Sequence, residues 1–367
     1  MRDTSTNPPT DPGSVRALLD GLVTARWPGA AVLEIADLPA DASSRRYLRC
    51  TLDGTAAEVC PPTSVVVMLL EDAAVAMSSE ELGVFANGGP TELPFLNLQR
   101  FLAAITDSVP EVYAVSGDQR TLVLEDLGDV SLWAAAKDPG ADTEALFARA
   151  LALLADIQAA AAPDRSCYAY SQCFDERLFG WEFDHFIEHG LASPPAEQLQ
   201  ACRLELAGLA ATLAHKPRVF CHRDYHAWNI HVADGRLRLF DFQDALLGPA
   251  FYDAASLLTD RSSSEIISPA MERRLLESFA QRTGVRDMAE AWDSYCLCAF
   301  QRALKVIGRF NFLAENKGKP AYLQLLPATV ATARRFAAEI DGLDATAGLL
   351  ARHVKSGRTD ELRSHDN

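Results

Sequence analysis

The stretch VFCHRDYHAWNIHVADGRLRLFDFQD, residues 219–244, places Asp224, Asn229 and Asp241 in a fixed order and spacing. Apolar and polar residues alternate around these three positions, as they do in short, half-buried strands. Phosphoryl transfer requires the same residue types: a carboxylate that accepts the proton of an attacking hydroxyl, and two oxygen ligands for Mg²⁺. The stretch therefore predicts Asp224 as the catalytic base and Asn229 and Asp241 as the metal ligands.

Asp234-Gly235 separates two strand-like runs, which predicts a β-hairpin. The hairpin would bring Asn229 and Asp241, at its open ends, to face one another. Mg²⁺ takes one or two carboxylates together with phosphate oxygens and water, so such a hairpin mouth suits it. Taken singly, the residues also fit other interpretations: a surface salt-bridge cluster at His222-Arg223-Asp224, and a turn residue at Asn229.

Length and composition limit the class of protein. The chain has 367 residues, is 49% hydrophobic and carries a formal net charge of −16. This charge argues against nucleic acid or an anionic membrane as the main partner. No apolar run approaches the roughly 20 residues that span a bilayer. The start lacks a signal-peptide pattern, and the eight cysteines lack zinc-ligand spacing. We therefore expect a cytoplasmic protein with reduced thiols.

Hydrophobic periodicity divides the chain into two parts. The first part predicts helices at 14–27 and 96–105 and strands at 31–38, 46–52, 56–60, 64–70, 112–115 and 121–125. The second part predicts helices at 143–162, 175–189, 196–215, 271–282, 288–310 and 322–339. We expect an α+β fold of two lobes: a small antiparallel-sheet lobe, 14–126, and a large, mainly helical lobe, 127–354, that contains the hairpin. Residues 1–13 read as a disordered arm and 355–367 as a flexible tail.

The crevice between two such lobes is the default binding site. The segment that crosses between them is Leu124-Glu125-Asp126-Leu127-Gly128, whose backbone amide and carbonyl groups can recognise an adenine edge. An acidic linker that ends in a glycine turn is the alternative interpretation.

Several stretches resemble a known family. HRDYHAWN (222–229) and DFQDALLGPAFYDAASLL (241–258) resemble the catalytic loop and metal-binding segment of the aminoglycoside phosphotransferase and choline kinase group, which has a protein-kinase-like fold. Within the group, the chain is most similar to the bacterial sugar kinases that phosphorylate the anomeric hydroxyl of N-acetylmuramate and N-acetylglucosamine in cell-wall recycling. The narrower match rests on residues 40–47, 124–128, 301–308 and 318–323.

The resemblance implies a set of nucleotide contacts. Ser43 and Ser44 stand where the fold has its phosphate-covering loop, although a plain hairpin turn is an alternative. Glu125, Asp126 and Leu127 stand at the nucleotide base. The run VVVMLL (65–70) lacks the lysine that related kinases keep there. Arg45 and Arg46 are the nearest replacements, and only one can point inward because neighbours on a strand face opposite sides. Arg46 is included among the predicted nucleotide contacts, and the choice between the two stays open.

The resemblance also implies substrate contacts. Arg302 and Lys305, three apart on a predicted helix, share a face that can bind a sugar acid or a phosphate. A solvated basic edge is the alternative. Glu182 is a further candidate for sugar hydroxyls, with a helix-surface salt bridge as its alternative. His226 and Asp244 complete the predicted substrate contacts, and Asp253 is expected to support the catalytic loop.

The sequence therefore predicts an ATP- and Mg²⁺-dependent kinase that phosphorylates an amino sugar at its anomeric hydroxyl, with neither nucleic acid nor membrane as a partner. One alternative is another acceptor, such as an aminoglycoside, choline or a different sugar. Another is an inactive nucleotide-binding scaffold, which the missing strand lysine favours and the intact Asp224, Asn229 and Asp241 set opposes. The oligomeric state is left open.

Overall fold

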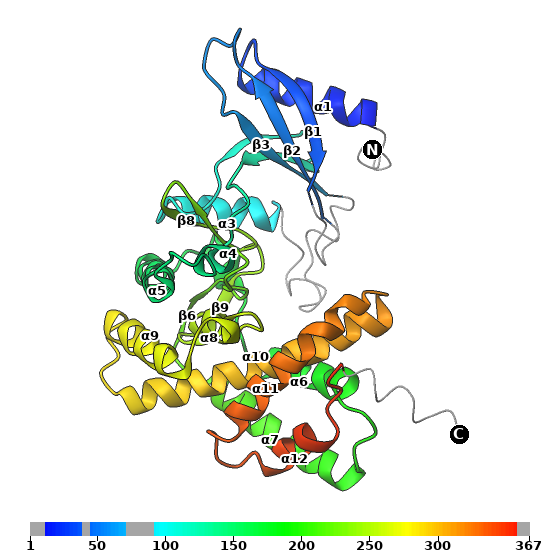
Figure 1. Cartoon of the computed structure of the whole chain (residues 1–367), viewed down its shortest axis with the longest axis vertical. Helices are drawn as coiled ribbons and strands as arrows, with labels where there is room; N and C mark the ends of the chain where they lie inside the picture. The colour runs from blue at the N-terminus through cyan, green and yellow to red at the C-terminus, as the bar shows by residue number, and fades with distance from the viewer. Residues whose placement is uncertain (1–11, 39–44, 71–91, 358–367) are drawn as a thin grey trace. The chain divides into compact units, whose positions relative to one another are not determined.

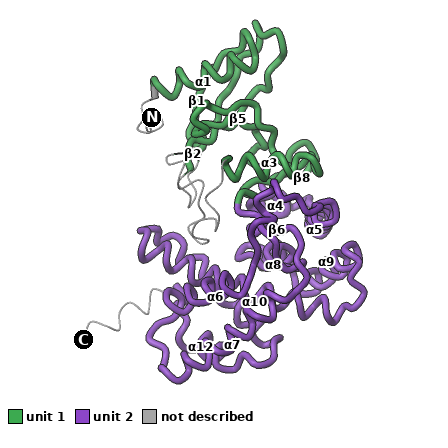
Figure 2. The backbone as a smooth tube through the Cα atoms, turned by 180° about the vertical axis from the view of Figure 1, so that it is seen from behind, with its two compact units in different colours: residues 1–129, 231–243 green, residues 130–230, 244–367 purple. Residues whose placement is uncertain are grey.

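The computed structural model describes residues 12–38, 45–70 and 92–357. The chain forms two compact units, which Figure 2 shows in green and purple. Unit 1 contains residues 1–129 and 231–243, and unit 2 contains residues 130–230 and 244–367. Most of the arm and tail expected at the two ends lies outside the described residues. The lobe boundary near residue 126 stays a prediction.

Unit 1 contains a five-stranded antiparallel sheet with the strand order β1-β2-β3-β5-β4. Its strands are β1 (Ala31–Asp37), β2 (Arg45–Asp53), β3 (Ser64–Leu70), β4 (Val112–Val115) and β5 (Thr121–Glu125). Helix α1 (Pro12–Arg26) packs on the sheet through Val15, Leu19 and Val23, whose spacing places them on one helical face. The sheet predicted for this part of the chain is confirmed.

The strand predicted at 56–60 is wrong. The backbone there turns, with the Ala57 amide donating to the Gly54 carbonyl at 3.1 Å and the Glu58 amide to the Pro28 carbonyl at 3.2 Å. Two prolines follow at 61 and 62, and proline has no amide hydrogen for a strand ladder. The turn and the prolines together outweigh the alternating pattern.

The Asp-Gly hairpin is confirmed. Strands β7 (Ile230–Ala233) and β8 (Arg236–Leu239) pair around Asp234 and Gly235, with φ values of +49° and +73°. Asp-Gly suits such a turn because both central residues need positive φ. Residues 231–243 belong to unit 1, where Phe242 stacks on Phe95 of helix α3 (Pro94–Ala103) at 5.0 Å between ring centroids. The sequence had assigned this hairpin to the helical lobe.

Unit 2 is mainly helical, and Figure 1 labels its larger helices. These are α4 (Leu132–Ala136), α5 (Thr143–Ala160), α6 (Glu176–His185), α7 (Ala196–Ala214), α8 (Tyr252–Thr259), α9 (Pro269–Arg282), α10 (Met288–Asn316), α11 (Leu326–Ala337) and α12 (Asp344–Arg352). Strand β6 (Arg218–Cys221) pairs with β9 (Leu246–Pro249). Side-chain caps at Asp142, Asp175, Ser268 and Asp287 accept backbone amides and set where four of the helices begin.

Three differences from the expected helices matter for the site. The helix predicted at 175–189 is α6 followed by one π-helical turn, Phe186–Gly190. Helix α8 was not expected, because residues 252–258 are all buried and show no polar face. Helix α10 extends to Asn316, beyond the predicted end. Among the described residues, no helix has the length and apolar character to cross a membrane.

Candidate active site

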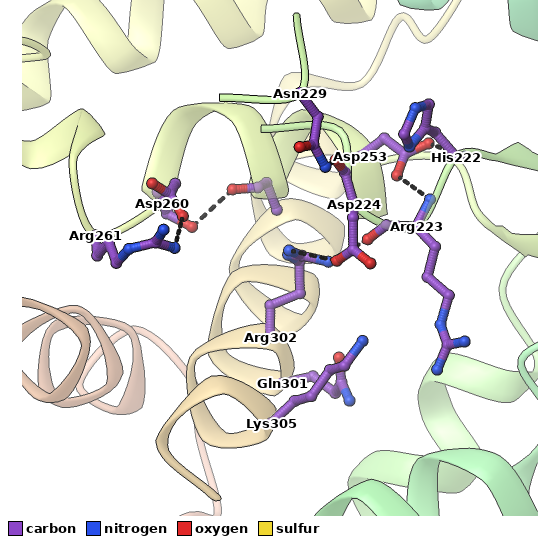
Figure 3. Close-up of polar contacts among 12 residues, drawn as sticks. His222, Arg223, Asp224, Asn229, Asp253, Asp260, Arg261, Gln301, Arg302 and Lys305 are labelled. Atoms are coloured by element: carbon purple, nitrogen blue, oxygen red, sulfur yellow. Dashed lines mark hydrogen bonds and ion pairs between the residues drawn. The ribbon is translucent and has the colours of Figure 1, made fainter. Parts of the chain in front are cut away.

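The loop that carries Asp224 joins β6 to β7, and a buried carboxylate of α8 fixes its start. Asp253 accepts the backbone amide of His222 at 2.6 Å and that of Arg223 at 3.0 Å (Figure 3). Burial raises the pKa of Asp253, although its contacts with His222 and its backbone hydrogen bonds act in the opposite direction. The supporting role expected of Asp253 agrees with this geometry.

Arg223 has a strained backbone. Its φ is +79°, a region that a residue with a Cβ rarely adopts. Asp253 binds its amide, and the Arg302 guanidinium donates to its carbonyl oxygen at 2.6 Å. Strain of this kind persists only where surrounding contacts over-determine the conformation, and it concentrates at functional sites. The contacts therefore fix the direction in which the next residue, Asp224, points.

Asp224 combines exposure with a strongly positive surrounding. Its side chain is 39% exposed, and Arg302 Nη2 lies 3.7 Å from its Oδ1 (Figure 3). The part of the group that is removed from water opposes ionisation, but the positive charges of Lys305 and Arg302 outweigh this effect and hold the pKa of Asp224 well below its usual range. At neutral pH the residue is a carboxylate that can accept a hydrogen bond from a hydroxyl.

Below the loop, Glu182 is fully buried among donors. Arg223 Nη2 lies 3.3 Å and Lys305 Nζ 3.4 Å from its Oε1, and the Gln301 amide donates to its Oε2. The side chain of Arg302 is 8% exposed and that of Lys305 is 13% exposed, so these two residues do not form a solvated edge. We call Glu182, Arg223, Asp224, Gln301, Arg302 and Lys305 the catalytic-loop cluster. Substrate contacts by Glu182, Arg302 and Lys305 stay predictions.

The side chain of Asn229 binds the backbone of the same loop, at Asp224. Its Nδ2 donates to the Asp224 carbonyl oxygen at 3.0 Å, so a metal ion would be bound through its amide oxygen. Its amide in turn donates to the His226 carbonyl at 2.9 Å. His226 donates its own amide to the Asp224 carbonyl at 3.0 Å. Burial lowers the pKa of the His226 ring, so this side chain is neutral at neutral pH.

Asp241 lies in unit 1 with φ +63°, a second strained position at a predicted functional residue. Its Oδ1 accepts from Arg45 Nη1 at 3.2 Å and from Gln243 Nε2 at 2.9 Å. Arg46 instead pairs with Asp37 at 2.7 Å, with both side chains exposed. Of the two arginines left open by the sequence, Arg45 therefore contacts the predicted metal ligand. A nucleotide contact by Arg46 stays a prediction.

The donor set at Asn229 and Asp241 fits Mg²⁺. It supplies one carboxylate and one amide oxygen, and Mg²⁺ usually adds phosphate oxygens and water to so few protein ligands. In the described ranges, no group of three His, Cys, Asp or Glu side chains is placed to hold a metal without such help. The approach of the two side chains to one another stays a prediction.

The crossing segment is fixed by its own acidic side chains. Arg49 donates to Asp126 and Asp129 at 2.7–2.9 Å. Arg238 donates to Glu125 at 2.7 Å and to the Val109 carbonyl at 3.1 Å. We call these side chains, Arg49, Glu125, Asp126, Asp129 and Arg238, the linker cluster. That the backbone amide and carbonyl groups of residues 125–127 contact a nucleotide stays a prediction.

The remaining predicted residues lie in different places. Ser43 and Ser44 lie outside the described residues. Asp244 lies in the turn before β9. The sequence missed Trp228, which stacks on Trp133 at 4.4 Å and donates Nε1 to Ser262 at 2.9 Å. Its position inside the HRDYHAWN motif was the available signal.

An ionised Asp224 on a backbone-fixed loop, followed along the chain by Asn229 and Asp241 around a hairpin, agrees with the arrangement predicted for an enzyme that transfers phosphoryl groups. The chain belongs to the phosphotransferase enzyme family, whose sequence pattern matches residues 34–295.

Named relatives agree with this assignment. The N-acetylmuramate/N-acetylglucosamine kinase of Neisseria meningitidis serogroup B is 27% identical over 305 residues, which cover 78% of this chain and 81% of that protein. The protein of the same name from Caulobacter vibrioides is 30% identical over 233 residues, which cover 60% of this chain and 63% of that protein.

Solved structures share the fold. The streptomycin–ATP complex of the aminoglycoside phosphotransferase APH(2")-IIa has a TM-score of 0.58 at 15% identity and covers 86% of this chain and 97% of its own. A choline/ethanolamine kinase family protein from Mesorhizobium loti has a TM-score of 0.55 at 13% identity and covers 87% of this chain and 92% of its own. The expected protein-kinase-like fold is confirmed.

Proposed function

We propose that this phosphotransferase is an ATP- and Mg²⁺-dependent kinase that phosphorylates the anomeric hydroxyl of an N-acetylated amino sugar. The observation that carries the proposal is Asp224, an exposed carboxylate that Arg302 and Lys305 keep ionised. The names of the two relatives above support the amino sugar as acceptor. ATP as the phosphate donor agrees with the nucleotide complexes among proteins of the same fold. We also propose that the enzyme acts in the cytoplasm, as the sequence led us to expect.

Each residue has a defined task in this proposal. Asp224 orients the acceptor hydroxyl and accepts its proton as the hydroxyl oxygen bonds to the γ-phosphorus, while the bond between the γ-phosphorus and the bridging oxygen breaks and ADP leaves. Asn229 and Asp241 would hold Mg²⁺, which neutralises negative charge on the phosphates when it is bound. Arg45, which contacts Asp241, takes the place of the lysine missing from β3 as a cation for the phosphates.

The acceptor class follows from the charges around Asp224. Arg302 lies 3.7 Å from this carboxylate and the charge of Lys305 also acts on it, so a cationic acceptor such as choline or an aminoglycoside would meet repulsion from these two groups. A neutral or acidic sugar would not. This is the feature that favours N-acetylated sugars over the cationic alternatives that share the fold.

One experiment tests the proposal. ATP consumption is measured with N-acetylglucosamine, N-acetylmuramate, choline and an aminoglycoside, and with the methyl glycoside of N-acetylglucosamine, whose anomeric oxygen is blocked. We expect turnover of the two free sugars and none of the methyl glycoside, with phosphorus NMR placing the phosphate on C1. Turnover of the methyl glycoside, or a phosphate on C6, contradicts the anomeric assignment. Nucleotide binding without turnover of any acceptor supports the scaffold alternative.

A further inference from the structure

Helices α6 and α10 pack side by side and run in the same direction. Contacts advance together along α10 and along α6 with the π-helical turn that follows it: Glu182 meets Lys305, Phe186 meets Gly308, and His189 meets Phe312. The approach is close at Gly308, where an added Cβ would lie 2.9 Å from the backbone of Phe186. The relative rotation of the two helices is therefore well defined.

Because α6 and α10 are parallel, the position of a residue relative to the contact line between them shows on which side of the helix pair its side chain lies. On α10, Arg302 follows Gln301, which faces α6, and is rotated from it by about 100°. On α6, Trp181 precedes Glu182, which faces α10, and is rotated by about 100° in the opposite sense. For two parallel helices, these opposite rotations bring Trp181 and Arg302 to the same side. Asp224, 3.7 Å from Arg302, lies on that side too.

Trp181 is built as a rigid, exposed surface. The residue is 38% exposed. Its ring stacks on His185 at 5.4 Å with an interplanar angle of 12°, and His185 packs against Phe312 at 5.2 Å. Among the described large apolar residues that are exposed, Trp181 and Trp228 are the two aromatic ones. The packed layer holds one face of the indole in place, and aromatic side chains of this kind commonly line small-molecule sites.

We infer that Trp181 forms the platform of the acceptor subsite, on which the apolar face of a pyranose ring stacks. The inference rests on the proposed function and extends it, because it names the residue that recognises the sugar ring. Arg302, which shares the side of Trp181, lies 3.7 Å from the Asp224 carboxylate, so a cation and this carboxylate both lie on the side of the helix pair that Trp181 presents. The site therefore suits neutral or acidic pyranoses, and the acceptor hydroxyl lies at the edge of the ring nearer to Asp224.

Substitution kinetics test the platform. Trp181→Ala should raise KM for N-acetylglucosamine about tenfold, the order expected for a lost stacking contact, with kcat and the KM for ATP within twofold. Trp181→Phe should restore most of the affinity, since it keeps an aromatic face. Trp292→Ala removes a partly exposed indole from the start of α10 and is the matched control, with no expected change in KM. Thermal melting of all three variants confirms that each is folded.

A binding measurement separates this inference from the proposed function. In protein labelled with ¹⁵N-tryptophan, the indole resonance lost in Trp181→Phe should shift when N-acetylglucosamine is added to the wild type without ATP. If the wild type phosphorylates the sugar but Trp181→Ala keeps the wild-type KM and the resonance does not move, the platform is wrong and the kinase assignment stands. If the wild type phosphorylates no amino sugar, the proposed function fails, and the inference fails with it.

Discussion

The linker cluster of unit 1 and the catalytic-loop cluster of unit 2 use the same chemistry, carboxylates paired with arginine, and differ in burial. In the linker cluster, the side chains of Arg49, Asp129 and Asp126 are 25%, 73% and 10% exposed, so one of its carboxylates stands in water. In the catalytic-loop cluster, the side chains of Arg223 and Glu182 are 3% and 0% exposed. The first cluster fixes a backbone segment, whereas the second also fixes a strained residue, Arg223, and the ionisation of its neighbour Asp224.

This difference shows that the burial of an ion pair, and not its presence alone, indicates how much its removal will affect stability and activity. A partly exposed pair is screened by water and contributes little beyond its geometry. A buried carboxylate among several donors leaves uncompensated charges if it is removed. We therefore expect substitutions to have large effects in the catalytic-loop cluster and small effects in the linker cluster.

The largest effect is expected at Asp224. Asp224→Asn removes the proton acceptor but keeps the shape of the side chain, so kcat should fall by about 10²–10⁴-fold, the usual contribution of a general base. Affinity for Mg·ATP, measured by calorimetry, should stay within twofold. A variant that keeps more than a tenth of the wild-type rate would remove Asp224 from this role.

Glu182→Gln tests burial directly. Breaking a buried ion pair by removal of one partner costs about 3–5 kcal/mol, and we expect a loss of this order in the free energy of unfolding measured with urea. Glu188→Gln is the matched control, because the side chain of Glu188 is 74% exposed and its loss should cost less than about 0.5 kcal/mol. Equal losses in the two variants would show that burial does not distinguish them.

Arg45 and Arg46 give a matched pair on one strand of unit 1. If Arg45 serves the phosphates, Arg45→Ala should raise KM for Mg·ATP about 10–100-fold, as expected for a lost charge-assisted contact of about 1.5–3 kcal/mol. Arg46→Ala removes an exposed pair with Asp37 and should leave this KM within twofold. The reverse order would assign the phosphate contact to Arg46.

In the linker cluster, Arg49→Ala should cost only about 1 kcal/mol of unfolding free energy, since Asp129 is exposed to water and Asp126 keeps the Ser64 hydroxyl and the Gly128 amide as donors. Arg49→Lys should not recover this loss fully, because a lysine cannot reproduce the forked donation to Asp126 and Asp129. Urea unfolding of Arg49→Ala, Arg49→Lys and Glu182→Gln under the same conditions compares the loss of unfolding free energy in the two clusters. A loss at Arg49 as large as that at Glu182 would contradict the comparison.

The smallest effect is a displacement of the pH profile. Lys305 and Arg302 hold the pKa of Asp224 below its ordinary value, so the residue stays ionised well into the acid range. Lys305→Met removes one of these charges and should raise that pKa, which moves the acid limb of kcat/KM to higher pH. The stability that the ionised Asp224 contributes is lost as pH falls through its folded-state pKa, so in this variant the loss should begin at higher pH. An unmoved acid limb would show that Lys305 does not act on Asp224.

Local sequence signals predicted the parts of the fold that depend on neighbours in the chain. Asp234-Gly235 dictates the hairpin, because few other pairs accept two positive φ values in succession. The apolar spacing at 14–27 predicted helix α1, and the structure shows that its apolar residues pack on the sheet. By contrast, the burial of Glu182 depends on contacts with Arg223 and Gln301, 41 and 119 positions away along the chain.

No periodicity in α6 predicts contacts over such distances, so Glu182 read equally well as a sugar contact and as a surface salt bridge. The choice between Arg45 and Arg46 was unresolved for a similar reason. Alternation along β2 shows that the two face opposite sides, but not which side carries Asp241. Residue types and spacing thus predicted the chemistry of the site, whereas the partners of each charge required the structure.

The close contact at Gly308 has a consequence for laboratory evolution of this enzyme. Any side chain at position 308 would push α10 away from the backbone of Phe186 and disturb the alignment of α6 with α10. A saturation library at this position should therefore yield almost no active clones under any selection. Trp181, which is partly exposed, should instead accept substitutions without loss of folding, so libraries that seek new acceptors will yield most when they randomise position 181 and keep Gly308 and the buried Glu182 unchanged.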